Sequence, residues 1–254
     1  MGKGDHIVIP KTILKNFSNN DNKKVTIYNL NTKEKKENFP DNIYVEKDYY
    51  EDDIDEYIKA KDETSIGNLY ASIKKKKINY KDIKNMKNIF IIQHYRNKSF
   101  SKNMSTNKLF NRIFHNIELK LVINQYLKNN EIQNTYIDEF HKDIYEYIES
   151  LYSSFIPGCL ILNKTQRTLI LPSSQFAYIK LLNTDSYLYP IAPDIALTWR
   201  KTDFKKDFDY LETTDNQAIN KVNQLICECE LKDKGDNIIY GLRNEIDKVI
   251  ENLN

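Results

Sequence analysis

The stretch Cys159-Leu-Ile-Leu-Asn-Lys-Thr-Gln-Arg-Thr-Leu-Ile-Leu171 places two short apolar runs on either side of a polar turn. Further apolar runs follow at Ala177-Tyr-Ile-Lys-Leu-Leu182 and at Ile195-Ala-Leu-Thr-Trp199. Short runs of aliphatic, β-branched and aromatic residues between turn residues are typical of strands. Because no connection of helix length separates these runs, their spacing predicts an antiparallel meander over residues 156–205 rather than a parallel sheet.

The residues that precede this meander have helical spacing. Apolar side chains recur at intervals of three and four residues, as expected for one buried helix face. One such helix is predicted to end near Arg96, and two more cover 110–121 and 137–151. We therefore expect a helical middle of about four helices over residues 51–155.

The two ends of the chain complete an α+β fold. Val25–Leu30 and Asn42–Val45 are predicted strands within a β-rich N-terminal part, residues 1–50. The closing part, 206–254, begins with a helix over 215–231 and ends with Ile238-Ile-Tyr240 and a short terminal helix. Inward positions on the first of these helices are predicted to be Ala218, Val222, Leu225 and Ile226. We expect one domain over 1–254, in which the helical middle packs on a mainly antiparallel sheet built from N-terminal and C-terminal strands.

Composition excludes several classes of protein. Among 254 residues, Lys and Arg number 38 and Asp and Glu 36, so the net charge of +2 excludes a strongly basic nucleic-acid coat. The six glycines form no dinucleotide-binding, P-loop or nucleophile-elbow motif. The chain is Lys-rich and has only five arginines, which is typical of an AT-rich bacterial genome.

The cysteine count indicates a compartment. Three cysteines, Cys159, Cys227 and Cys229, favour a reducing cytoplasm over a disulfide framework. The first ten residues contain no apolar stretch of signal-peptide length, and no apolar stretch is long enough to span a membrane. We therefore expect a cytoplasmic protein without a membrane partner. The oligomeric state is left open.

No metal site is predicted from ligand spacing. The four histidines form no chelating pair, and Cys227 and Cys229 point about 200° apart on a helix. Asp194 and the Asp203-Phe-Lys205 run resemble the Pro-Asp…Asp-x-Lys layout of metal-dependent nucleases. Unless the chain turns back, however, the strand between the two carboxylates would hold them more than about 20 Å apart. We predict no cofactor, and a divalent metal has no support from this spacing.

Three ordered patterns resemble the bacterial family called domain of unknown function 4238. They are His6-Ile-Val-Ile-Pro10 with the following Leu14 and Phe17, Gln93-His-Tyr-Arg96 with Phe100, and Tyr189-Pro-Ile-Ala-Pro-Asp194. The family also tends to have a Ser-Asp-Asn-Pro-like turn after a strand. The corresponding stretch here, Pro172-Ser-Ser-Gln-Phe176, has no carboxylate, and the family name implies no activity.

His6, Gln93 and Arg96 are the candidate catalytic residues. Gln93 and Arg96 are three residues apart, so they share one side of a helix and are suited to hold a phosphate or a carboxylate. His6, beside a rigid proline, is suited to act as a general acid or base. The alternative is that Arg96 binds the carbonyls at the helix end while Gln93 bonds to the backbone.

Lys74, Lys75, Lys76 and Lys77 form the densest cluster of positive charge. They are candidates for binding nucleic-acid phosphates, with Tyr95 available to stack on a base. The alternative is a solvated turn between two helices.

Two classes of function are therefore kept. The first is a hydrolase or nuclease-like enzyme that acts on a phosphate-bearing substrate, RNA or DNA. The second is a non-catalytic binding or interaction protein, such as a conflict-system or toxin-type effector. The absent carboxylate in the Ser173-Ser174 turn favours the second class.

Overall fold

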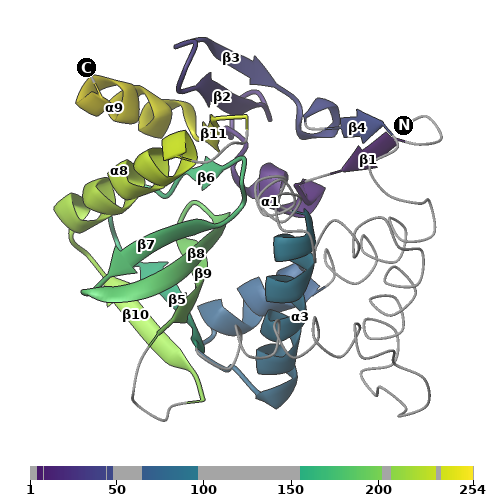
Figure 1. Cartoon of the computed structure of the whole chain (residues 1–254), viewed down its shortest axis with the longest axis vertical. Coiled ribbons are helices and arrows are strands. Elements are labelled where there is room, and N and C mark those ends of the chain that lie inside the picture. The colour runs from purple at the N-terminus through teal and green to yellow at the C-terminus, as the bar shows by residue number, and fades with distance from the viewer. Residues whose placement is uncertain are drawn as a thin grey trace, which may run out of the picture.

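The computed structural model describes residues 5–7, 9–43, 45–47, 65–96, 155–201, 207–232 and 236–253, with only the backbone at 5–7, 45–47, 87–88 and 91–96. The fold is α+β, as predicted, and its sheets are mainly antiparallel (Figure 1). An unlabelled helix covers 65–74. The other elements are β1 (Asp5–Ile7), α1 (Lys11–Asn16), β2 (Val25–Asn29), β3 (Lys35–Asn38), η1 (Pro40–Asn42), β4 (Val45–Lys47), α3 (Tyr80–Arg96), β5 (Ile156–Leu162), β6 (Leu171–Pro172), β7 (Ala177–Leu181), β8 (Thr184–Ala192), β9 (Ile195–Arg200), β10 (Asp209–Thr213), α8 (Asn216–Lys232), β11 (Ile238–Gly241) and α9 (Arg243–Leu253).

A five-stranded sheet in the order β10-β5-β9-β8-β7 lies between α3 and α8. Successive residues of one strand belong to different hydrophobic clusters, because successive side chains point to opposite faces. On β5, Cys159 and Ile161 join the cluster that contains Phe90 of α3, whereas Leu160 and Leu162 join the cluster that contains Ile226 of α8. Burial on both faces explains why these strands are continuous apolar runs rather than alternating ones.

β7, β8 and β9 pair antiparallel in sequence order and form a meander, but its strands are not all those predicted. Of the predicted runs, β5 pairs with β9, and the run that ends in β6 joins the other sheet. A two-residue turn joins β7 to β8, with positive φ at Leu182 (50°) and Asn183 (61°). β8 had not been predicted, since Pro190 interrupts its pattern; the register of β8 against β9 shifts between Pro190 and Ala192, where a proline is tolerated. β10 is a second unpredicted strand, and it pairs parallel to β5.

The second sheet, in the order β3-β2-β11-β6, joins the two ends of the chain. β2 pairs antiparallel with β11, with Tyr28 opposite Ile239, so the N-terminal and C-terminal strands do form one sheet. α9 packs on β2 and β11. β1 and β4 make a separate antiparallel pair in which His6 lies opposite Glu46.

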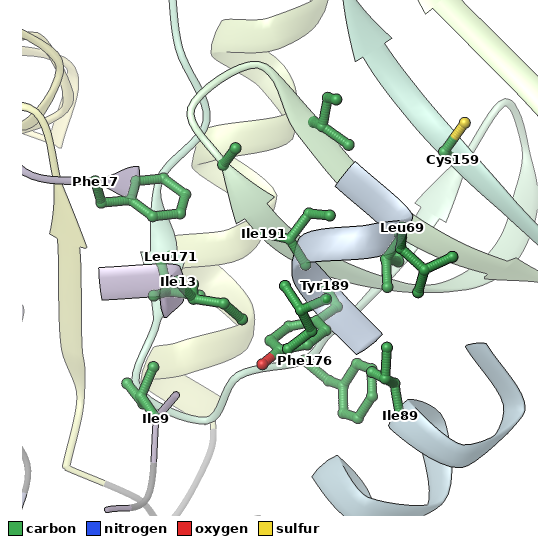
Figure 2. Close-up of a cluster of buried hydrophobic side chains, with 14 of the residues drawn as sticks. Ile9, Ile13, Phe17, Leu69, Ile89, Cys159, Leu171, Phe176, Tyr189 and Ile191 are labelled. Carbon is green, nitrogen blue, oxygen red and sulfur yellow. The ribbon is translucent and has the colours of Figure 1, made fainter. Parts of the chain in front are cut away.

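The core joins the N-terminal segment to both sheets and to α3. Figure 2 shows Ile13 and Phe17 near Leu171 of β6 and Ile191 of β8, with Phe176 beside Tyr189. The ring centroids of Phe176 and Tyr189 are 5.3 Å apart. Residues that are more than 100 positions apart in sequence therefore share one apolar cluster.

Two expected strands are shorter or displaced. The run at 168–171 was predicted as a strand, but only Leu171 and Pro172 pair, because the backbone of the preceding residues is bonded by side chains of α8 and α9. The strand predicted at 42–45 is also wrong in place, since η1 occupies Pro40–Asn42 and Val45 begins β4. The helices predicted at 110–121 and 137–151 lie outside the described residues. In the part of the chain that the structure describes, no helix combines the length and the hydropathy needed to cross a membrane.

Gly158 on β5 is predicted to be essential for the pairing with β10. A β-carbon at this position would overlap the carbonyl oxygen of Asp209 and lie 3.0 Å from Thr198 Oγ1. We expect Gly158→Ala to lower the free energy of unfolding by about 2 kcal/mol, measured by urea unfolding.

The matched control is Gly67→Ala, in the exposed part of the 65–74 helix, where no described atom outside the helix's own backbone lies within 4 Å of a new β-carbon. Alanine there is expected to stabilise by up to about 1 kcal/mol. Equal effects of the two substitutions would contradict the close approach of β10.

Candidate functional site

A pocket of about 440 Å³ opens where the turn after α1, the segment after β5 and the first turn of α9 meet. Its walls come from three distant parts of the chain, which the pairing of β2 with β11 brings together. Polar side chains dominate the lining. The described lining residues are Asn19, Asn20, Asp21, Gln166, Thr168, Leu242, Arg243, Asn244, Glu245 and Lys248.

Glu245, which lines the pocket, forms a buried ion pair with Arg167. Arg167 donates from Nε (2.8 Å) and Nη2 (2.6 Å) to Glu245 Oε1, and Glu245 is only 3% exposed. The backbone N–H of Thr168 (3.2 Å) and Nδ2 of Asn223 (2.9 Å) also donate to this carboxylate. The negative charge of Glu245 is therefore satisfied from within the protein and does not act on a ligand.

The rim of the pocket carries two cations. Arg243 forms an ion pair at 2.8 Å with Glu37 of β3, and this carboxylate neutralises most of the charge of Arg243. Within the described part of the chain, Lys248 makes only a long hydrogen bond, 3.4 Å, to the carbonyl oxygen of Gln166. The N–H of Arg243 donates to Asn19 Oδ1 at 2.8 Å, which fixes the turn after α1 to the start of α9. Lys248 is thus the cation most available to a ligand among the described lining residues.

A second polar cluster is sealed in the core beneath β6. Glu230 of α8 is fully buried and accepts hydrogen bonds from the hydroxyl of Ser173 and from the N–H (3.2 Å) and hydroxyl (2.7 Å) of Ser174. Burial, together with the nearby Glu230, raises the pKa of Tyr240 well above its usual value. Glu230 of α8 therefore places a carboxylate beside the Ser173-Ser174 turn, whose own sequence contains none.

The predicted catalytic residues lie on two elements. His6 lies on β1, and Gln93 and Arg96 lie in the last turns of α3, three residues apart as expected. Tyr95 belongs to the same helix. The described side chains do not include these four, so their convergence on one cleft stays a prediction.

The lysine cluster lies at the end of the 65–74 helix and in the turn after it, and all four side chains are exposed. Lys74 forms an ion pair with Asp194, and this hydrogen bond raises the pKa of Lys74. Lys76 binds Glu212 at 2.5 Å, and its hydrogen bond lowers the pKa of Glu212. These two lysines anchor the turn to the end of the five-stranded sheet, while Lys75 and Lys77 have no ion pair within the described residues.

Metal and thiol chemistry receive little support in the described part of the chain. No group of three or more His, Cys, Asp or Glu side chains is placed there to hold a metal ion. Asp194 lies in the turn before β9, and Asp203 is outside the described residues. Cys227 and Cys229 both lie on α8, as predicted, and burial raises the pKa of Cys159 and of Cys227 to about 12. Neither of these two buried thiols is a nucleophile at neutral pH.

Sequence reasoning missed the pocket, Glu230 and the Arg167 network, but one signal was available. In a chain that strongly prefers lysine, an arginine indicates a place where a guanidinium group is needed to pair with a carboxylate. Arg167, Arg200 and Arg243, the arginines whose side chains the structure describes, pair with Glu245, Asp209 and Glu37, respectively. The scarcity of arginine therefore indicates that Arg167 has a carboxylate partner, which the structure shows to be Glu245.

A family model described as a protein of unknown function (DUF4238) matches residues 6–229. The matched range covers most of the chain and ends just before Glu230, β11 and α9. No curated protein and no solved structure matches the chain.

Arg167→Ala is predicted to be strongly destabilising. It leaves the Glu245 carboxylate buried without its cation, so we expect the free energy of unfolding to fall by about 3 kcal/mol. Lys35→Ala is the control, because Lys35 pairs at 2.8 Å with Asp247 on the exposed side of the same helix and is expected to cost under about 1 kcal/mol. Comparable losses in urea unfolding of the two variants would contradict a special role for the buried pair.

Proposed function

The chain belongs to the DUF4238 family of proteins of unknown function, and we propose that it binds a phosphate-bearing ligand in the pocket at the start of α9. The observation that supports this is the charge balance of the pocket. Glu245 is neutralised by Arg167, and the Asp21 carboxylate lies near Arg243. Among the described residues, by contrast, Lys248 is bound only to a backbone carbonyl. A ligand therefore meets an available cation there.

The start of α9 adds to this attraction. The first backbone N–H groups of a helix carry partial positive charge and favour anions. Glu245 and Ile246 bond to the carbonyl of Leu242, and Arg243 bonds to Asn19, but Asn244 has no backbone partner within the described residues. One N–H group and the Lys248 ammonium are thus offered to the same ligand.

The volume of the pocket limits the ligand. About 440 Å³ lies within the usual range for small-molecule sites and suits one nucleotide rather than a longer segment. RNA or DNA would therefore enter by a terminal nucleotide.

Inorganic phosphate is the probe for this proposal. At low ionic strength we expect the wild-type protein to bind it, and Lys248→Ala to weaken binding about tenfold, because a charge-assisted hydrogen bond contributes about 1.5–3 kcal/mol. The measurement is isothermal titration calorimetry.

The control is Lys180→Ala, an exposed lysine on β7 that does not line the pocket. It should bind phosphate as the wild type does. The proposal is wrong if the wild type binds no phosphate, or if Lys248→Ala and Lys180→Ala behave alike.

A second proposal is the hydrolase or nuclease-like activity on RNA or DNA. It is supported by the helical spacing of Gln93 and Arg96 on α3, which suits a phosphate clamp, with His6 as general acid or base. The exposed Lys75 and Lys77 are available to bind the nucleic-acid backbone.

Arg96→Ala tests this activity. If Arg96 stabilises charge on a phosphate, cleavage of labelled RNA and DNA oligonucleotides should fall by about 100-fold while the melting temperature is kept. Lys81→Ala, an exposed substitution on the same helix, should cleave as the wild type does. A large loss of melting temperature in Arg96→Ala would instead assign a structural role to Arg96.

A further inference from the structure

Three carboxamide side chains around the pocket, those of Asn20, Gln166 and Asn244, are exposed and uncommitted. None of them has a side-chain hydrogen bond within the described residues. By contrast, the carboxamide of Asn19 is occupied by the Lys24 carbonyl (2.9 Å) and by the N–H of Arg243 (2.8 Å). Each uncommitted carboxamide offers one acceptor and one donor group to a ligand.

The charged groups of the lining differ in what they offer a ligand. Lys248 lies by the Gln166 carbonyl. The pKa of Arg243 is raised by its hydrogen bond to Glu37, and further by the nearby carboxylates of Asp21 and Asp247. The Asp21 carboxylate accepts a hydrogen bond from the N–H of Asn22 at 2.9 Å, and as an anionic acceptor it repels a phosphate and attracts a hydroxyl. A ligand that fits these groups carries its phosphate near Lys248 and hydroxyl groups near Asp21.

The lining also disfavours recognition of a base. Bases bound by proteins usually stack on aromatic rings. The described lining residues include no aromatic side chain, and Leu242 is their single apolar member. The described lining therefore offers hydrogen-bonding groups but no stacking surface.

We infer that the pocket takes a sugar phosphate and reads it through its hydroxyl groups, with Asn20, Asp21, Gln166 and Asn244 as their partners. This inference rests on the proposed phosphate site and specifies its ligand. Applied to nucleotides, it means that a ribose is preferred to a deoxyribose, whereas the identity of the base matters little.

The experiment compares ribose 5-phosphate, 2-deoxyribose 5-phosphate, inorganic phosphate and the four ribonucleoside monophosphates by calorimetry on the full chain. We expect ribose 5-phosphate to bind about tenfold more tightly than phosphate and about threefold more tightly than its deoxy form, since each further hydrogen bond adds about 0.5–1.5 kcal/mol. The four nucleotides should agree with one another within about threefold.

Two variants separate the hydroxyl contacts from the phosphate contact. The double variant Asn20→Ala/Gln166→Ala should narrow the preference for ribose 5-phosphate over phosphate from about tenfold to about twofold. Lys248→Ala should weaken both ligands together and keep their ratio. Melting temperatures check that each variant is folded.

The outcomes are distinguishable. Equal binding of ribose 5-phosphate and phosphate overturns this inference and leaves the phosphate site in place. A nucleotide that binds more than tenfold better than the other three also overturns it, in favour of base recognition. No binding of any probe overturns the proposed function as well.

Discussion

Two buried carboxylates, Glu230 and Glu245, hold the connection between β5 and β7 against α8 and α9. This connection leaves the five-stranded sheet, adds β6 to the four-stranded sheet and then returns. Asn223 bonds the same connection at Thr168 and Ile170, through its amide and its oxygen. Buried polar backbone groups need partners, and here side chains supply the bonds that a strand ladder would otherwise give. The relative placement of the sheets, and of Thr168 and Glu245 in the pocket lining, depends on these bonds.

This constraint explains which face of α8 is buried. The sequence predicted an apolar face that includes Ala218, but Ala218 is exposed and Ile219 takes its place. The buried face also includes Asn223 and Glu230, which hydropathy alone assigns to solvent. The helix is turned so that these two polar side chains meet the β5–β7 connection while Val222 and Ile226 still pack on the sheet.

The lysine cluster shows how the same residue type serves two purposes. The sequence predicted either a nucleic-acid surface or a solvated turn at Lys74–Lys77. All four side chains are exposed, and Lys74 and Lys76 also bind Asp194 and Glu212, which come from the turn before β9 and from the unpredicted strand β10. Charge counted along the chain could not reveal these partners, because they lie more than 100 residues away. Lys75 and Lys77 keep the exposure that a nucleic-acid surface requires.

The sequence by itself determined the α+β class, the strands β7 and β9, the helix α8 and the family resemblance. Each of these depends on local periodicity or on a short motif, which one stretch of chain contains in full. The tertiary structure alone decided the parallel pairing of β10, the burial of Glu230 and Glu245, and the pocket. Those features join residues from distant segments, and the free energy of burying a charge depends on the partner that the fold brings to it.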